Sequence, residues 1–261
     1  MLKALLRTVG QGLCLSLPLA AGAQAASVVF LNPGHSNENF WVSYSRFMQA
    51  AAQDLGMELR VQYSERRADL ALSQARAILK GPERPDYLVL VNEQYVAPEI
   101  IRLSRGSGVK LFLVNNGLTA TQASSIQAQP ERYAPVLGTL TGNDEQAGYQ
   151  MLREMVALLP RSNGPVDLLA FAGIKTTPAS QLREQGMRRA LADFPQVRLR
   201  QVVYGGWSRQ RAYEQAQLLL ERYPQTQLVW SANDEMAFGV MQAFAAAWRK
   251  PGLDTVFCAV D

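Results

Sequence analysis

Amide and carboxylate side chains recur where apolar, strand-like runs give way to helical ones. The stretch "LVWSANDEMAFGV", residues 228–240, begins as a buried strand and continues as a helix, and three polar residues lie at the junction. Asn233 carries a hydrogen-bond donor and an acceptor, which suits a ligand hydroxyl that does both. We expect Asp234 to cap the following helix by accepting from its first-turn N–H groups. Similar residues lie at the other strand ends: Asn32, Asn92, Glu93, Asn115, Asn116 and Asp261.

The residues that covalent or metal chemistry would need are sparse. His35 is the only histidine, and it lies in a Gly-His-Ser turn that we interpret as a loop. No Cys-x-x-Cys, phosphate-loop or Gly-x-Ser-x-Gly pattern accompanies it. A carboxylate pair drawn from Glu38, Glu93 and Asp261 could do acid–base work, but no pattern singles such a pair out. We therefore expect a binding protein without cofactor or metal, and not an enzyme.

Composition and charge limit the class of partner. The chain has 261 residues, 48% of them hydrophobic, which is enough to bury a core in one large or two modest domains. Lys and Arg number 26 against 22 Asp and Glu, and this small excess is scattered and forms no run that could follow a phosphate backbone. Nucleic acid is therefore not an expected partner, and we expect a monomer.

The N-terminal segment predicts export. Lys3 and Arg7 precede the apolar stretch "LCLSLPLAAG", and Ala23 and Ala25 offer the small residues that a signal peptidase reads. We expect residues 1–25 to be a cleaved signal peptide and the mature protein to be periplasmic. A retained membrane anchor is the alternative, and the short, interrupted apolar stretch disfavours it.

The elements that position these residues alternate regularly between strand and helix. The first helix is expected to bury the face that carries Phe40, Tyr44, Phe47, Met48, Ala51 and Leu55. Residues 117–135 are polar and read as a long connection, and from residue 136 the alternation resumes. Such alternation requires parallel strands joined by right-handed crossovers. We predict two tandem, doubly wound α/β lobes, residues 26–140 and 141–261.

Ligands of open parallel sheets bind beyond the carboxyl ends of the strands, where side chains and free N–H groups are presented. Amides and carboxylates occupy nearly every strand end of this chain. If the two lobes turn these ends toward each other, the residues line a hydrogen-bonding cleft between them.

The chain resembles the periplasmic sugar-binding proteins of the ribose and galactose type, which serve ABC importers. The resemblance covers residues 27–261 and rests on the order and spacing of several segments rather than on any single one. These segments are "ENFWVSYSRFMQAAAQDLG", "TGNDEQAG", "LREQGMRRAL", "SANDEMAFGV" and a final strand that ends in Asp.

The resemblance implies a set of sugar contacts. Phe40, Trp41 and Trp207 would supply aromatic faces to the C–H faces of a sugar, although Phe40 and Trp41 could simply pack in the core. Arg183 would donate two hydrogen bonds from its planar fork, and a solvated helix arginine is the alternative. Asp261 would accept from a pair of hydroxyls.

Two departures from the pentose-binding pattern affect the expected ligand. Glu38-Asn39 stands where those proteins show Asn-Pro, and Asn115-Asn116 stands where they show Asp-Arg. Glu38 and Glu93 would add negative charge near the first lobe's strand ends, unless Glu38 only complements its helix dipole. The expected ligand is thus another sugar, a polyol, or a small polar molecule with a positive group.

Proteins of this type continue past the aspartate that matches Asp261 and return to the first lobe. We therefore expect either a chain that lacks its C-terminal part or a first lobe with an exposed sheet edge. The expected partner is the permease of an ABC importer, and a membrane sensor such as a kinase, cyclase or chemoreceptor is the alternative. A DNA-binding repressor is excluded because the signal segment occupies the place of its DNA-binding helices.

Overall fold

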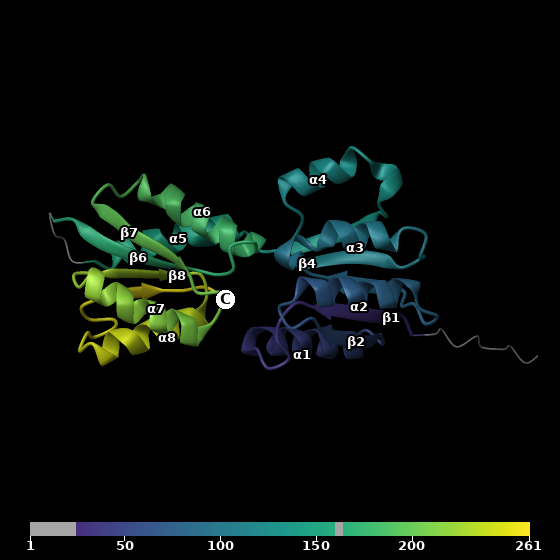
Figure 1. The fold of residues 1–261 in the computed structure, drawn as a ribbon, viewed down its shortest axis with the longest axis horizontal. Helices are drawn as coiled ribbons and strands as arrows, with labels where there is room; N and C mark the ends of the chain where they lie inside the picture. Colours follow the sequence, from purple (N-terminus) through teal and green to yellow (C-terminus); the bar gives the residue numbers. More distant parts are fainter. Residues whose placement is uncertain (1–24, 160–163) are drawn as a thin grey trace, which may run out of the picture.

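The computed structural model describes residues 25–159 and 164–261, so the predicted signal peptide lies outside the described residues except for Ala25. The first lobe is built on a parallel sheet of order β2-β1-β3-β4-β5 (Figure 1). Its strands are β1 (Ser27–Asn32), β2 (Glu58–Tyr63), β3 (Tyr87–Leu90), β4 (Lys110–Asn115) and β5 (Val136–Thr141). The sequence pattern places residue 136 at the start of the second run of alternating strands and helices. In the structure, however, β5 pairs with β4 and completes the first sheet.

Helices cover both faces of this sheet. Helices α2 (Ala68–Lys80) and α3 (Ala97–Ser104) bury residues such as Ile78 and Ile100 against one face, because their apolar residues recur at helical spacing. Helix α1 (Asn39–Asp54) packs on the other face through Trp41. The 3₁₀ turn η1 (Glu93–Tyr95) follows β3.

Two details of the first lobe differ from the expectation. Helix α1 buries Trp41, Ser45 and Ala52, whereas Phe47 and Leu55 are exposed. The expected connection over residues 117–135 contains helix α4 (Ala120–Gln127) and the 3₁₀ turn η2 (Pro130–Arg132). Helix α4 buries no residue and forms because Thr119 and Gln122 make a capping box, a signal that hydrophobic periodicity does not contain.

The second lobe has a parallel sheet of order β7-β6-β8-β9. Its strands are β6 (Val166–Ala172), β7 (Val197–Tyr204), β8 (Leu228–Ser231) and β9 (Val256–Cys258), and its helices are α5 (Asp144–Ala157), α6 (Pro178–Leu191), α7 (Arg209–Arg222) and α8 (Asp234–Ala246). Phe171, Trp230 and Phe244 are fully buried in its core. The prediction of two parallel-sheet α/β lobes is confirmed.

Close helix packing fixes the position of Arg183 in α6. A Cβ atom on Gly148 of α5 would lie 1.9 Å from the Arg183 carbonyl oxygen, and one on Gly186 of α6 would lie 1.8 Å from the Glu145 carbonyl oxygen. Only glycine permits this approach of the two backbones. The carboxyl ends of both sheets point toward the junction between the lobes (Figure 1). Within the described ranges, no helix is long and apolar enough to cross a membrane.

Candidate ligand-binding site

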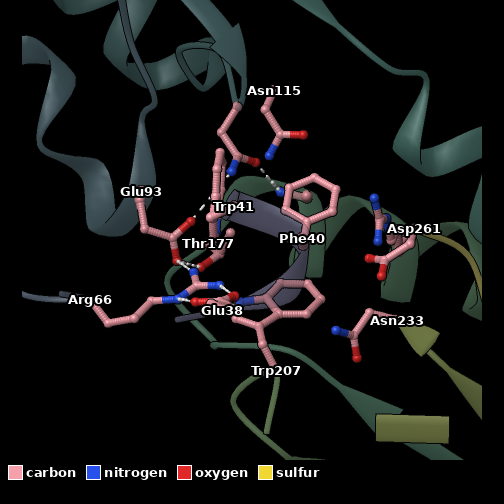
Figure 2. Close-up of a pocket in the computed structure, with 13 residues that line it drawn as sticks. Glu38, Phe40, Trp41, Arg66, Glu93, Asn115, Thr177, Trp207, Asn233 and Asp261 are labelled. Carbon is pink, nitrogen blue, oxygen red and sulfur yellow. Dashed lines mark hydrogen bonds and ion pairs between the residues drawn. The ribbon is translucent and has the colours of Figure 1, made fainter. Parts of the chain in front are cut away.

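A cavity lies between the two lobes and encloses about 380 Å³, part of it open to solvent (Figure 2). All ten residues predicted as ligand contacts line it, and they come from both lobes. Three further lining residues were not predicted. The full lining is Glu38, Phe40, Trp41, Arg66, Glu93, Asn115, Asn116, Thr177, Ala179, Arg183, Trp207, Asn233 and Asp261.

Arg66 lies between the two glutamates of the first lobe. Its Nε donates to Glu38 Oε2 at 3.0 Å, its Nη2 pairs with the other Glu38 oxygen, and its Nη1 donates to Glu93 Oε1 at 3.1 Å. Burial raises the pKa of Glu93, and the Arg66 charge opposes that rise. Arg66 therefore compensates one of the two negative charges expected from Glu38 and Glu93, and the raised pKa of Glu93 reduces the other. Arg66 follows the end of β2. Because ligands bind beyond the carboxyl ends of parallel strands, this position could have identified Arg66 as a candidate site residue.

The aromatic residues of the first lobe have two roles. Trp41 is 2% exposed and packs among Phe30, Phe40 and Tyr44, with ring centroids 6.5, 4.9 and 5.6 Å away. It is thus a core residue, as the alternative interpretation held, and it also forms part of the cavity wall. Phe40 is only partly buried and presents its ring to the cavity (Figure 2).

Trp207 reaches the cavity from the turn between β7 and α7. Its φ of 67° lies in the left-handed region, next to Gly206 at 65°. Its ring lies over Gly173, where a Cβ atom would approach within 2.2 Å of the ring. Its Nε1 is buried without a hydrogen-bond partner, as is Nε1 of Trp41. Both indole N–H groups are therefore donors without an acceptor in the described part of the chain.

Arg183 is largely committed to contacts within its own lobe. Its Nε donates to Asp144 Oδ1 at 2.7 Å, and its Nη1 donates to the carbonyl oxygens of Ala232 at 2.6 Å and Val260 at 3.2 Å. Only Nη2 remains for another acceptor. The expected donation of two hydrogen bonds through the guanidinium fork is therefore reduced to one nitrogen.

Asn233 serves the helix that follows it. Its Oδ1 accepts from the Met236 N–H at 3.1 Å, and its extended backbone, φ −152° and ψ 168°, is that of an N-cap. The expectation that Asp234 caps α8 is wrong, because Asp234 is already the first helical residue. The Asn233 Nδ2 points into the cavity (Figure 2).

The Asp261 carboxylate also faces the cavity (Figure 2). Burial of this carboxylate and, next, the charge of Asp234 raise its pKa to about 6, while the Arg183 charge opposes the rise. A hydroxyl that donates to Asp261 would favour its ionised form.

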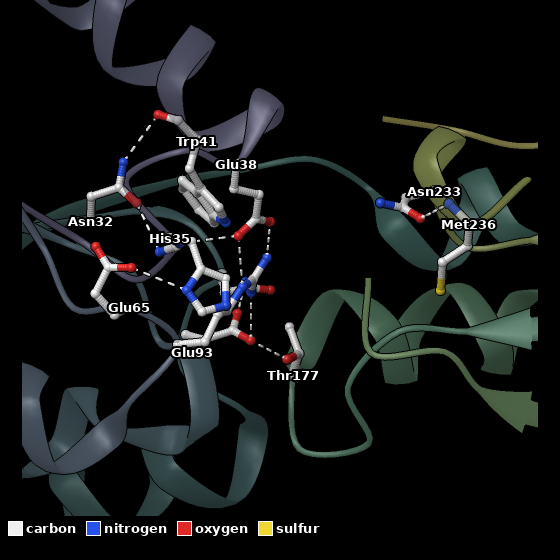
Figure 3. A network of polar contacts seen from close by, with 12 residues as sticks. Asn32, His35, Glu38, Trp41, Glu65, Glu93, Thr177, Asn233 and Met236 are labelled. Carbon is white, nitrogen blue, oxygen red and sulfur yellow. Dashed lines mark hydrogen bonds and ion pairs between the residues drawn. The ribbon is translucent and has the colours of Figure 1, made fainter. Parts of the chain in front are cut away.

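The lobes touch through hydrogen bonds at the cavity. Thr177 Oγ1 donates to Glu93 Oε1 at 2.5 Å (Figure 3), and the Ala179 N–H donates to Asn116 Oδ1 at 2.8 Å. Asn115, with φ of 61°, turns the chain just before Asn116. His35 lies apart from the cavity lining, with its exposed ring 3.1 Å from Glu65. Among the described residues no cluster of three or more His, Cys, Asp or Glu could hold a metal ion.

The model of the family described as "Periplasmic binding protein domain" matches residues 28–260. The chain belongs to this family. A periplasmic sugar-binding protein from Pseudomonas fluorescens is 58% identical, with a TM-score of 0.80 over 89% of this chain and 68% of that one. The resemblance seen in the sequence is confirmed.

More distant relatives are also similar to this chain. A D-apiose import binding protein from Paraburkholderia graminis is 25% identical over 239 residues, which are 90% of this chain and 70% of that protein. An arabinose ABC transporter component from Shewanella, bound to L-arabinofuranose, is 19% identical, with a TM-score of 0.76 over 90% of this chain and 74% of that one. Both relatives are named as binding proteins.

Proposed function

We propose that this protein captures a neutral monosaccharide between its lobes and delivers it to the permease of an ABC importer. The observation that carries the proposal is that one cavity gathers side chains from both lobes, with aromatic rings and free polar atoms together.

Charge compensation favours a neutral ligand over a cationic one. Arg66 pairs with Glu38 and Glu93, and Arg183 pairs with Asp144. The groups left for a ligand are the Arg183 Nη2, the Asn233 Nδ2, the Asp261 carboxylate and the indole N–H groups. This set of mostly single donors with one strong acceptor suits the hydroxyls of a sugar.

Export and lobe movement complete the proposal. Residues 1–25 act as the signal peptide, and the mature monomer works in the periplasm as lobes 26–140 and 141–261. The segment Thr141–Asn143 joins β5 to α5 and serves as the hinge on which the lobes close over the sugar. Import is favoured over docking on a membrane sensor, because the curated relative is an import protein.

A thermal-shift screen against neutral monosaccharides, polyols and amino sugars tests the proposal. A neutral sugar at a hundred times its Kd should stabilise the fold by roughly 2.7 kcal/mol. Arg183→Ala and Asn233→Ala should abolish the ligand-induced shift in melting temperature. Because both residues also have structural contacts, the shift of each variant is measured from its own ligand-free melting temperature. A shift with amino sugars alone, or one that survives both substitutions, would contradict the proposal.

A further inference from the structure

Helix α6 is capped by the opposite lobe. Thr177 is its N-cap residue, with extended backbone angles, yet its side chain makes no cap hydrogen bond. The hydroxyl donates instead to Glu93 of the first lobe, and Asn116 of the first lobe accepts from the Ala179 N–H. Helices α5 and α8 differ, because Asn143 and Asn233 cap them locally.

The contact excludes water. Asn116 is 2% exposed, Thr177 1% and Ala179 4%. A buried helix N–H without an acceptor is costly, so the Ala179 N–H depends on Asn116 while the lobes touch. The partial positive charge at the start of α6 also favours the nearby Glu93 carboxylate.

We infer that Asn116 and Thr177 exchange the cap of α6 when the lobes open and close. In the closed form Asn116 caps α6 from across the cleft, and Glu93 holds the Thr177 hydroxyl away from its own helix. In the open form both partners are withdrawn, and the Thr177 hydroxyl turns back to accept from the first-turn N–H groups, as a threonine at an N-cap ordinarily does. Asn116 is thus a positioning residue for closure rather than a ligand contact.

The exchange of caps couples closure of the lobes energetically to the cavity. Helix α6 also carries Arg183, six residues after Thr177, so the helix that Asn116 caps is the one that presents Arg183 to the cavity. This consequence rests on the proposed sugar-binding function. The cap exchange itself does not, and it can be measured without ligand.

Amide-resolved hydrogen exchange of the ligand-free full chain tests the inference. In Asn116→Ala the Ala179 amide should exchange about five-fold faster or more, the factor that corresponds to loss of a typical cap. In Thr177→Val the Ala179 amide should keep its wild-type rate, because its acceptor is intact. An unchanged rate in Asn116→Ala, or an increase in Thr177→Val, would overturn the inference.

The matched control is Thr119→Ala, which removes the cap of α4 within the first lobe. It should speed exchange at the start of α4 only; an equal increase at Ala179 would mean that Asn116→Ala acts through general destabilisation. The exchange of caps also predicts that the effects of the two substitutions on amide hydrogen-exchange rates are not additive. The Thr177 hydroxyl does not accept from the Ser180 amide while the lobes touch. This amide should therefore exchange more slowly than in the wild type in Asn116→Ala, where Thr177 takes over the cap, and lose that protection in Asn116→Ala/Thr177→Val. Equal hydrogen-exchange rates of the Ser180 amide in Asn116→Ala and in the double variant would also overturn the inference.

Discussion

Trp207 lies in the cleft because Gly173, the residue that follows strand β6, has no side chain. Its ring occupies the space that a Cβ atom on Gly173 would need. Gly173→Ala should push the ring out of place without straining the local backbone, since Gly173 does not have a left-handed φ. We expect about ten-fold weaker sugar binding, comparable to the loss of one stacking contact.

Calorimetric titration with the sugar found in the screen measures this effect. Leu218→Ala in α7 is the control, because Leu218 is 69% exposed and lies outside the cavity lining. Wild-type affinity in Gly173→Ala would remove Trp207 from the site.

We predict that the Asp261 carboxylate makes sugar affinity depend on pH. With a pKa of about 6 it is about one-tenth ionised at pH 5 and mostly ionised at pH 7. Since bound hydroxyls need the ionised acceptor, the sugar Kd should rise about ten-fold from pH 7 to pH 5. The sign for the ligand-free fold is opposite: a raised carboxyl pKa favours the protonated folded state, so this group's contribution to stability falls as pH rises from 3.8 to about 6.

Titrations at pH 5, 6 and 7 of the wild type and Asp261→Asn check this dependence. The variant should bind more weakly at pH 7 and show a flat profile. A wild-type Kd that does not change with pH would mean that Asp261 does not accept from the ligand.

At the scale of elements, the α5–α6 contact determines where Arg183 and Asp144 meet. Gly186→Ala would place a Cβ atom against the Glu145 carbonyl of α5 and force the helices apart. We expect a loss of about 3 kcal/mol in unfolding free energy, at the upper end for overpacking, together with weaker sugar binding. Urea unfolding and titration measure the two effects. Wild-type values for both would show that α6 can shift without disturbing the site.

The helices and strands also show which features of the protein could be predicted from its sequence and which could not. Alternating strand and helix patterns are local, so the two lobes and the polar strand ends could be predicted from them. Helix α4 was missed because a capping box, and not an apolar face, marks it. The partners of Arg183 could not be predicted, because they are set by contacts such as the Ala232 carbonyl, 49 residues away. The Asn233 cap is a local contact, and it was predicted one residue too late, at Asp234.

At the scale of the whole molecule, the account depends on a sugar that touches both lobes at once. The first lobe contributes aromatic rings and a compensated ion cluster, and the second contributes Trp207, Asn233 and the free nitrogen of Arg183. Neither half of the cavity surrounds a ligand alone, so we expect a bound sugar to favour the form in which both lobes meet.

Hydrogen exchange with and without the neutral sugar found in the screen tests this claim most directly. The account predicts that saturating sugar slows exchange simultaneously in residues 39–45 at the start of α1 and in residues 233–238 at the start of α8. Protection confined to one lobe, or absent from both while the sugar binds, would contradict it.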